Sequence, residues 1–600
     1  MGKLTYRMKK SLNIKNGYLI GIGVFSLFLI VGSFSYALFT VQTESKGTLN
    51  IITGNLHSYI ESEELGTTNS IVLNSKETRV ITMNLKNLNP IDAKFNLWYE
   101  AAEGVEVSYD NSKDAPPSKA GYKVETEGVK TYKLKITNNR SEEQKIQFGS
   151  EVGLENKNLS FPEGKRVIEG IVPKVKMDSN MIQVVYDGSK WVKAGENNWY
   201  DYDLGRWANA VTVTSATRAN YQSAASGTEI NMNDIETMWV WVPRYSYTIG
   251  SVDGTNYYGK QGIYLSDAPT QSLPGEIDIK FIGKTEKDTE NAKYKVSEGR
   301  SGWRTPDAFT FGEEELSGIW VGKFETSSST QTAENGGGNT AELDPIIKPN
   351  VISWRAIQAA NIGEVGRKLN ATGNRYGFST SLVSHAMKND EWAAVAYLSQ
   401  SKYGKLGNLD YSNENKEIYQ NKSDSYITGC SSGGPSKEGE KGCPYTYDIS
   451  LTGTGSSTTG TIYGIYDMSG GAHELLMANF KKYSGQNDSS NSGYTGSLGV
   501  GGNYSGKAWL EDKYYNFYVA PTDTENSTAV VTCNKETCIS HALTEVSGWY
   551  GDNVMTGGEI KYPWMTRGGN SSEFTSSGIF RNNQHTGNGA SDISLRLVLS

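Results

Sequence analysis

Two short stretches decide the fold of the larger part of this chain: Gly464-Ile-Tyr-Asp-Met-Ser-Gly-Gly-Ala-His-Glu-Leu475 and Thr566-Arg-Gly-Gly-Asn570. Each contains a pair of adjacent glycines, Gly470–Gly471 and Gly568–Gly569. Glycine adopts positive φ, or lets two backbones approach closely, without the strain that other residues suffer. We therefore expect a tight turn or a close backbone contact at both pairs.

Around these stretches stand residues suited to a core with few aliphatic side chains. Trp354, Trp392 and Trp564 each combine a large apolar surface with one hydrogen-bond donor. Glu391 and Glu474 belong to the same motifs, and we expect both carboxylates to accept hydrogen bonds from backbone amides in that core. A catalytic carboxylate pair is the alternative interpretation. The combination predicts a loop-rich core.

The composition of the whole chain restricts the classes of protein that it can belong to. Hydrophobic residues make up only 37% of 600 positions, yet 36 Tyr and 13 Trp stand against 15 Pro, which excludes a disordered chain because such chains lack aromatics. The 66 Gly argue against a helix-rich chain. The net charge of −8 argues against electrostatic binding of nucleic acid, so no nucleic-acid partner is expected.

The N-terminal region predicts export. Five Lys or Arg residues stand in the first sixteen positions, and an uncharged run of 23 residues follows at 17–39. As a helix this run spans about 34 Å, enough for a bilayer core. The basic flank stays in the cytoplasm, so the rest of the chain is expected outside. Residues 1–40 are either a retained transmembrane anchor or a signal peptide cut near 33–37, which would release a secreted protein; a buried core helix is the third alternative.

Tryptophan marks a domain boundary. Only Trp98 precedes residue 190, whereas the other twelve follow it, and Pro173 punctuates the chain between the two parts. We therefore expect a domain at 41–178, an aromatic-rich lead-in at 179–235 and a large domain at 236–600.

Hydrophobic periodicity distinguishes the two domains. In the 41–178 part, apolar and polar residues alternate over 81–85 and 132–136. A period of two, interrupted by Asn, Gly and Ser turns, predicts an antiparallel β-sandwich of seven or eight strands. In the large domain, near-helical spacing predicts helices over 353–369 and 384–398.

Four cysteines fall into two local pairs, Cys430/Cys443 and Cys533/Cys538. An exported chain permits disulfides, so we expect each pair to close a loop. Zinc is the alternative, but neither spacing matches the usual ligand pattern and His541 is the single nearby histidine.

Six motifs occur in a fixed order along the large domain. They are Thr237–Gly250 (TMWVWVPRYSYTIG), Ile319–Ser327 (IWVGKFETS), Val351–Ala356 (VISWRA), Asn389–Ala396 (NDEWAAVA), Gly464–Leu475, and the closing pair Thr566–Asn570 with Ser594–Val598. Together they resemble the formylglycine-generating-enzyme or sulfatase-modifying-factor family, which has a C-type-lectin-like fold. The resemblance implies an α+β protein with a loop-rich head at 236–600. Ser35–Thr40 and Gly47–Ile51 resemble the export region of TasA/camelysin-like surface proteins of Gram-positive bacteria.

The chain departs from both chemistries that this family implies. Formylglycine-generating enzymes carry a copper-binding cysteine pair in the final segment, and 578–597 holds no cysteine. The ergothioneine-synthase-like branch uses a histidine-rich iron site, and His473 stands where the family usually has Trp. None of the five histidines is paired as such a site requires: His57, His385, His473, His541 and His585. We therefore expect no catalytic residue and no enzyme.

The family can hold calcium through loop carboxylates and carbonyls. Candidates by residue type are Asp467, Glu511, Asp512 and Asp552, since calcium takes hard oxygen ligands. Solvated acidic loops are the alternative. No cofactor is expected otherwise.

The segment 570–592 has the composition of a binding surface. Adaptable polar side chains with a few aromatics are typical of paratopes, and an ordinary polar loop is the alternative. The candidate ligand-binding residues are Asn570, Ser572, Glu573, Phe574, Phe580, Arg581, Asn582, Asn583, His585 and Asn588.

We therefore expect an exported surface protein, anchored through 17–39, that displays a C-type-lectin-like head for an extracellular protein or glycan ligand. A fibre or pilus-like component that self-assembles through the sandwich is the structural alternative. The four asparagines of 570–592, the residue type that adenine-directed mutagenesis changes most, also fit a variable protein of a diversity-generating retroelement. A sulfatase-modifying-type oxidase is the catalytic alternative.

Overall fold

The computed structural model describes residues 51–600 apart from several gaps. These gaps are 54–55, 66–67, 89–91, 110–121, 125–127, 155–164, 169–174, 196–197, 251–275, 291–292, 296–298, 333–335, 437, 481–508, 519–538, 544, 547, 555–561 and 574–575. Within the described residues the fold is rich in strands and has few helices, and no helix is long and apolar enough to cross a membrane. The expected anchor or signal segment, 17–39 within 1–40, lies outside the described residues. The chain divides into two compact units, 1–171 and 172–600.

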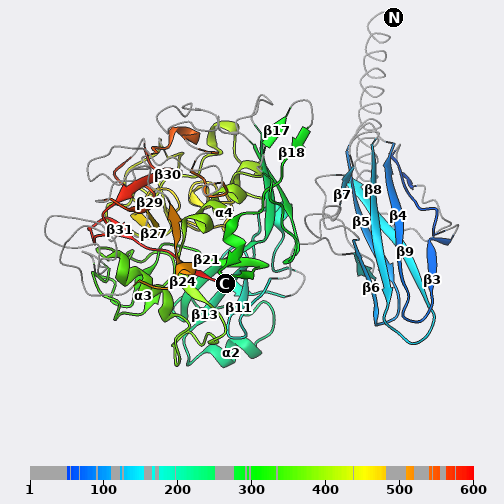
Figure 1. The fold of residues 1–600 in the computed structure, drawn as a ribbon, viewed down its shortest axis with the longest axis horizontal. Coiled ribbons are helices and arrows are strands. Elements are labelled where there is room, and N and C mark those ends of the chain that lie inside the picture. Colours follow the sequence, from blue (N-terminus) through cyan, green and yellow to red (C-terminus); the bar gives the residue numbers. More distant parts are fainter. Residues whose placement is uncertain are drawn as a thin grey trace, which may run out of the picture. The chain divides into compact units, whose positions relative to one another are not determined.

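The first unit consists of two antiparallel sheets (Figure 1). The first sheet has the order β1 (Ile51–Thr53), β2 (Leu56–Glu61), β4 (Thr78–Asn87), β8 (Val129–Asn138) and β6 (Val105–Tyr109). The second has the order β10 (Arg166–Val167), β5 (Ala93–Glu100), β9 (Gln144–Leu154) and β3 (Ser70–Leu73), and β7 (Tyr122–Val124) pairs with β5.

The core of this unit follows the predicted alternation. Ile81, Met83 and Leu85 of β4 are fully buried, as are Leu134 and Ile136 of β8. Side chains of successive strand residues point to opposite faces, so these residues line one side of their sheet. The predicted alternation is therefore confirmed, although the described residues form ten strands rather than seven or eight.

A seven-stranded sheet forms one part of the second unit. Its order is β12 (Trp191–Lys193), β11 (Ile182–Tyr186), β13 (Asn209–Val213), β14 (Ile235–Pro243), β21 (Gly318–Gly322), β32 (Leu597–Leu599) and β24 (Ser384–Ala386). Every residue of β14 is buried, which explains why its sequence lacks polar alternation. The segment 179–235 supplies β11, β12 and β13, so it shares this sheet with the C-terminal β32.

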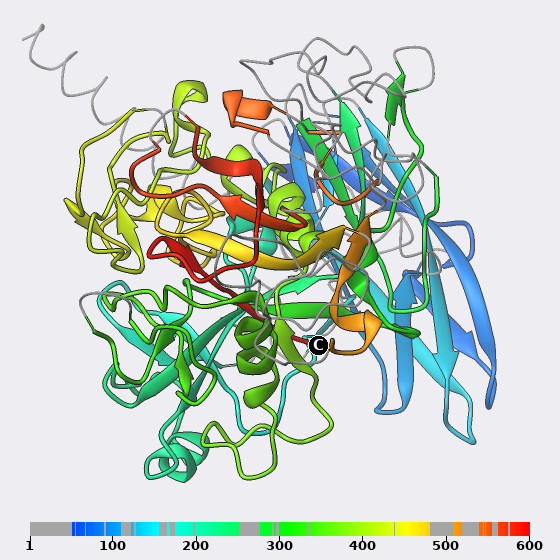
Figure 2. The same ribbon diagram turned by 60° about the vertical axis from the view of Figure 1, so that its left-hand side comes forward.

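A second sheet carries the glycine motifs. Its order is β28 (Asn516–Tyr518), β27 (His473–Phe480), β29 (Trp564–Gly568) and β30 (Gly578–His585), and β31 (Ile593–Ser594) pairs with β27. Figure 2 shows the red C-terminal strands beside the yellow-to-orange β27. The remaining strands form pairs: β15 (Tyr245–Gly250) with β16 (Glu276–Phe281), β17 (Lys293–Lys295) with β18 (Gly299–Ser301), β19 (Thr310–Phe311) with β20 (Glu314–Glu315), β22 (Ser327–Ser328) with β23 (Pro345–Ile346), and β25 (Cys430–Ser431) with β26 (Tyr445–Thr446).

The helices of the second unit are short. The α-helices are α2 (Arg218–Ser223), α3 (Ala359–Lys368) and α4 (Asn389–Ser399). The single-turn 3₁₀ helices are η3 (Tyr202–Leu204), η5 (Asp307–Phe309), η6 (Lys405–Gly407), η7 (Asn413–Asn415), η8 (Thr454–Ser456), η9 (Asp512–Tyr514) and η10 (Trp549–Gly551).

Both predicted helices begin later than expected. Ala356 has a φ of 59°, a left-handed conformation that an α-helix does not contain, so α3 starts only at Ala359. Residues 384–386 pair with β32, and α4 starts after Lys388, whose amide N–H donates to Glu391. That bond satisfies one free N–H of the first turn and confirms the backbone partner expected for Glu391.

Tryptophan side chains fill the core of the second unit. Trp354, Trp392 and Trp564 are fully buried, and the indole N–H of Trp392 donates to the carbonyl of Ile579. Cys430 and Cys443 form the expected disulfide, whereas Cys533 and Cys538 lie outside the described residues.

Candidate ligand-binding site

Polar side chains from four segments meet beside the glycine motifs. Nε2 of His473 lies 3.3 Å from Oε2 of Glu573 and 3.9 Å from Oδ2 of Asp592. The amide of Asn570 donates to the same Asp592 oxygen at 3.0 Å. We call the group His473, Asn570, Glu573, Arg581, His585 and Asp592 the polar cluster.

The glycine turns place these segments together. Gly470, Gly471, Gly568 and Gly569 all have φ between 72° and 80°, which confirms the predicted turns. The amide N–H of Ser571 donates to the carbonyl of Gly471, so the two motifs contact each other directly. A Cβ at Gly471 would lie 2.3 Å from Glu325, a distance that side chains do not tolerate. A backbone hydrogen bond also holds the start of β27: the amide N–H of His473 donates to the carbonyl of Asp592, the residue just before β31.

Arg581 holds Glu573 in place. Its side chain is 3% exposed, and Nη2 lies 2.8 Å from Oε1 of Glu573. Nη1 donates to the carbonyl of Ser576 at 3.0 Å. The backbone amide of Asn570 donates to the other Glu573 oxygen. The carboxylate therefore has a fixed orientation, and 29% of its side chain remains exposed.

The two imidazoles of the cluster are neutral near pH 7. Burial lowers the pKa of His473, and it lowers the pKa of His585 to about 4, helped by the proximity of His473. The Glu573 carboxylate favours a proton on Nε2 of His473. Nδ1 of His473 is then an acceptor, and it is buried without a hydrogen-bond partner. Nδ1 of His585 accepts the amide N–H of Gly587 at 3.1 Å.

An aromatic residue and an arginine flank Asp592. The guanidinium of Arg355 lies 4.1 Å from the ring centre of Tyr426, a cation–π distance, and it donates to the carbonyl of Ser591. Burial raises the pKa of Tyr426, and the nearby charge of Asp592 adds to the shift. Tyr426 therefore adds an aromatic residue beside the carboxylates and neutral imidazoles of the cluster.

A second set of charges lies behind the cluster, fully enclosed. Glu474 pairs with Arg596 at 2.8 Å, and Glu325 accepts the amide N–H of Ala472 at 2.9 Å. Asp467 accepts from Asn421 at 2.9 Å. We call Glu325, Asp467, Glu474 and Arg596 the buried acid network. The partner of Glu474 is thus a guanidinium and not the backbone amide that the sequence suggested.

The three acids of this network outnumber its single arginine. Burial raises the pKa of Glu325 well above its usual range, and the charge of Asp467 raises it further. An uncompensated buried charge is costly, so the proton remains on the carboxyl instead. The network therefore supports the turn at Gly471 from inside the core.

The structure places the predicted binding residues in several different environments. Asn570, Glu573, Arg581 and His585 belong to the polar cluster, and the exposed Ser572 donates to Asn570 at 2.8 Å. Asn583 and Asn588 are half-buried. Phe580 and Asn582 are buried, and Phe580 packs on Trp549. Phe574 lies outside the described residues.

Sequence reasoning missed two members of the cluster. His473 appeared only as a departure from the family's Trp, and Asp592 closed the candidate segment without being selected. The departure at His473 was the usable signal, because a polar residue at a core position calls for a partner. Asp592 is brought in by the parallel pairing of β27 with β31.

The calcium candidates lie in different environments. Asp467 is 1% exposed within the buried acid network, and Asp552 is 4% exposed and accepts the amide N–H of Phe580. Glu511 pairs with Lys513, next to Asp512 on η9. Over the described residues, no three His, Cys, Asp or Glu side chains are grouped as a metal site requires.

Comparison with known proteins adds no family to this picture. No protein-family model matches the chain, and no curated protein matches it. The residues of the polar cluster and their chemistry are therefore the basis for a functional proposal. Fixed carboxylates beside neutral imidazoles can accept and donate hydrogen bonds to hydroxyl or amine groups of a ligand.

Proposed function

We propose that the chain is an exported surface protein whose second unit recognises an extracellular ligand without covalent chemistry. The observation that carries this proposal is the polar cluster, in which fixed side chains keep their outer atoms exposed. Glu573 and Asp592 have side chains that are 29% and 33% exposed. The arginine that orients Glu573 is buried beneath it.

Preorganisation supports recognition by this cluster. Binding costs free energy when side chains must be ordered, and a surface that is already ordered avoids much of that cost. The Glu573 carboxylate accepts hydrogen bonds from the Arg581 side chain and from the backbone amide of Asn570, which fix its position. Asp592 is held by the Asn570 amide. A ligand that offers hydroxyl or amine donors, such as a glycan or a protein loop, suits these acceptors.

The wider interpretation of the chain belongs to the same proposal. A C-type-lectin-like, sulfatase-modifying-factor-like head at 236–600 and a membrane anchor at 17–39 rest on the motifs of the sequence. The absence of a catalytic role rests on the missing family cysteines. The variable-protein and oxidase alternatives rest on the sequence in the same way.

Binding of the full chain to a glycan array and to extracellular-matrix proteins tests the proposal. We expect Glu573→Gln and Asp592→Asn to weaken a detected interaction at least tenfold, because each removes a charged acceptor while keeping the shape of the side chain. Glu342→Gln is the matched control, since Glu342 is exposed and lies outside the cluster. Ligands that bind all three variants equally would show that the cluster does not recognise them.

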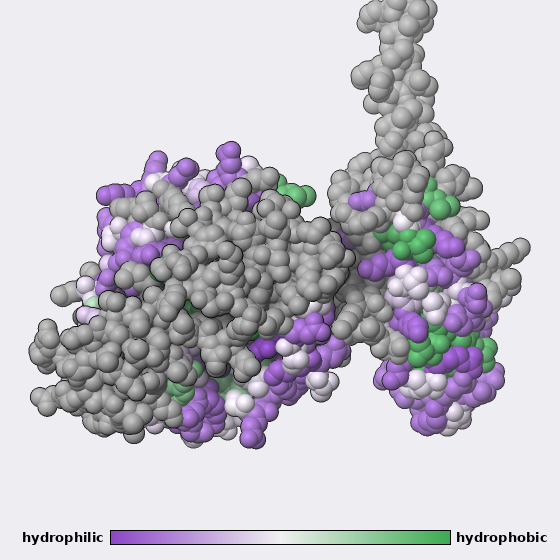
Figure 3. All heavy atoms as spheres, turned by 45° about the horizontal axis from the view of Figure 1, so that its top comes forward, coloured by the Kyte–Doolittle hydropathy of each residue, from purple (hydrophilic) through white to green (hydrophobic). Residues whose placement is uncertain are grey.

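One observation favours self-assembly of the first unit as a second candidate function. The described surface of this unit shows apolar spots among polar residues (Figure 3). Val72 on β3 is 43% exposed, and β9 is the one strand that pairs with β3 among the described residues. An apolar edge strand is a template for pairing with another chain. Light scattering should show growing particles for the full chain and fewer for Val72→Lys; a chain that stays monomeric at high concentration over days contradicts assembly.

A further inference from the structure

The disulfide between Cys430 and Cys443 closes a loop of the second unit. Cys430 is fully buried, whereas Cys443 at the other end of the loop is exposed. Beside this disulfide, β25 and β26 pair through only two residues each. Thiol–disulfide exchange needs access to one of the two sulfur atoms. The exposed position of Cys443 therefore leaves this disulfide open to attack by a thiol in solution.

The disulfide loop is hydrogen-bonded to the segment 420–422. The amide N–H of Ser432 donates to the carbonyl of Gln420 at 3.0 Å, and that of Gly442 donates to the carbonyl of Lys422 at 2.9 Å. The Lys422 ammonium also donates to two carbonyls of the loop. The loop therefore holds both ends of this segment.

The same segment supports the glycine turn and Asn570 of the polar cluster. The amide N–H of Asn421 donates to the carbonyl of Ser469, and that of Gly471 donates to the carbonyl of Asn421, each at 2.8 Å. The side-chain amide of Gln420 donates to the carbonyl of Asn570 at 3.0 Å. The segment thus connects the disulfide loop to both glycine motifs.

Asn570 in turn orients the two exposed carboxylates of the cluster. Its backbone amide donates to Glu573 at 3.1 Å, and its side-chain amide donates to Asp592 at 3.0 Å. Ordered acceptors lower the cost of binding a ligand. A loss of order at Asn570 therefore affects both acceptors at once.

A continuous set of hydrogen bonds thus runs from the disulfide loop through 420–422 to Asn570. We propose that the Cys430–Cys443 disulfide is a redox-sensitive support of the polar cluster. The cross-link limits the conformations that the loop can adopt when it opens, so the loop opens more often once the disulfide is reduced. Asn570 and the turn at Gly471 then lose part of their support. The inference rests on the proposed function, because it adds regulation to the site proposed there.

Reduction by a dithiol such as dithiothreitol takes two exchange steps. A thiolate of the reagent attacks the sulfur of Cys443, the S–S bond breaks, and Cys430 leaves as a thiolate that takes up a proton. The second thiolate of the reagent then attacks the reagent's own sulfur in the mixed disulfide, and Cys443 leaves and is protonated in the same way. The reagent is oxidised by two electrons to a cyclic disulfide, and the protein gains two thiols.

Hydrogen exchange of the full chain, measured with and without dithiothreitol, tests the support. We expect the amides of Asn421, Gly471 and Ser571 to exchange at least tenfold faster after reduction, because local opening exposes them. Unchanged exchange at Gly471 would overturn the proposal.

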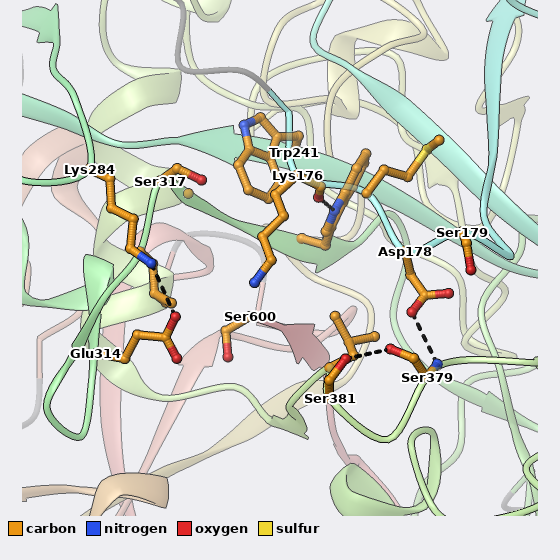
Figure 4. A pocket seen from close by; sticks show the side chains of 15 residues that line it. Lys176, Asp178, Ser179, Trp241, Lys284, Glu314, Ser317, Ser379, Ser381 and Ser600 are labelled. Carbon is orange, nitrogen blue, oxygen red and sulfur yellow. Dashed lines mark hydrogen bonds and ion pairs between the residues drawn. The ribbon is translucent and has the colours of Figure 1, made fainter.

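A cavity of about 290 Å³ elsewhere in the second unit supplies the reference amides (Figure 4). Trp241 and Leu316 line it, and both of their amides are hydrogen-bonded to carbonyls. In the described part of the chain, no hydrogen bond joins the lining of this cavity to 420–443. We expect these two amides to exchange at the same rate before and after reduction. An increase equal to that at Gly471 would show a general loss of stability and overturn the proposal.

The variant Cys430→Ser with Cys443→Ser separates this disulfide from the other two cysteines of the chain, Cys533 and Cys538. Without reductant, its Gly471 amide should exchange as fast as in the reduced unmodified chain, and dithiothreitol should add nothing at that amide. An acceleration by dithiothreitol equal to that of the unmodified chain would place the sensitivity at Cys533 and Cys538 and overturn the proposal.

Ligand binding distinguishes this inference from the proposed function. A ligand detected on the glycan array or among the matrix proteins should bind the reduced chain at least fivefold more weakly than the oxidised chain. Equal binding to both would overturn the regulation. Faster exchange at Gly471 in a chain that binds none of these ligands would confirm the redox-sensitive support and contradict only the proposed function.

Discussion

Two adjacent residues of β27 belong to two different environments: in one the charged side chains are partly exposed, and in the other they are fully buried. His473 belongs to the polar cluster, where Glu573 and Asp592 keep part of their side chains exposed. Glu474 belongs to the buried acid network, where Glu474 and Arg596 are both 0% exposed. Successive strand residues point to opposite faces, so one strand separates a surface suited to a ligand from a network that stabilises the fold.

The two environments should also respond oppositely to pH. The cluster contains an imidazole whose pKa is lowered by burial, and the network contains a carboxyl whose pKa is raised by burial. A histidine whose pKa is lowered in the folded state reduces stability as the pH falls, whereas a carboxyl whose pKa is raised reduces stability as the pH rises. Four predictions test the difference between the polar cluster and the buried acid network.

The largest effect is expected from Arg596→Met. Removing the guanidinium leaves the Glu474 carboxylate without its ion-pair partner in the core, and breaking a buried ion pair costs about 3–5 kcal/mol. Chemical denaturation should show this loss in the free energy of unfolding. Lys368→Met removes a half-exposed ion pair with Asp344 and should change that free energy by less than about 1 kcal/mol. Equal losses in both variants would mean that the network does not stabilise the core.

Acidification should weaken the polar cluster through His585. Its folded pKa is about 4, below the unfolded value, so between these two values the unfolded state binds more protons and stability falls as the pH falls. From pH 7 to pH 5 the loss attributable to this group is up to about 2 kcal/mol. His585→Gln lacks the titrating group, so its stability should fall less over the same interval. Parallel pH curves of the two chains would contradict a half-buried, neutral His585.

The opposite slope is expected from Glu325 in the buried acid network. Its folded pKa is well above the usual range, so above the unfolded pKa the folded state holds the extra proton and stability falls as the pH rises. Glu325→Gln keeps an acceptor for the amide of Ala472 and cannot ionise. We expect this variant to gain stability relative to the unmodified chain from pH 4 to pH 8, measured by denaturant unfolding at each pH. A gain on the acid side instead would show that Glu325 is ionised in the folded chain.

Local patterns predicted what depends on local geometry. The alternation around Ile81 and Leu134 identified buried sandwich residues, and the glycine pairs identified turns, because both are set by neighbouring residues. The predicted start of the helix over 353–369 was too early. The left-handed conformation of Ala356 prevents a helix there, although the apolar residues continue on both sides of it. Glu474 meets a partner 122 positions away in Arg596, and no local pattern encodes such a contact.

The same reasoning explains which half of the site was predictable. Composition selected Asn570, Glu573 and Arg581 because polar residues gather in one segment of sequence. It also selected Phe580 and Asn582, which are buried because all five residues of β30 from 578 to 582 are buried. His473 and Asp592 join the cluster only through the pairing of β27 with β31, a tertiary contact.

The smallest expected effect tests whether the polar cluster serves the fold or the surface. Glu573→Gln retains acceptor and shape but removes the charge that faces Arg581, and the pair is partly exposed, so the free energy of unfolding should fall by only about 1 kcal/mol. Arg596→Met, in the network behind, should cost several times more. If Glu573→Gln costs as much as Arg596→Met in denaturant unfolding, the cluster is part of the core that holds the chain together. A small cost with a large loss of ligand binding instead assigns the polar cluster, which contains His473, to recognition and the buried acid network, which contains Glu474, to stability.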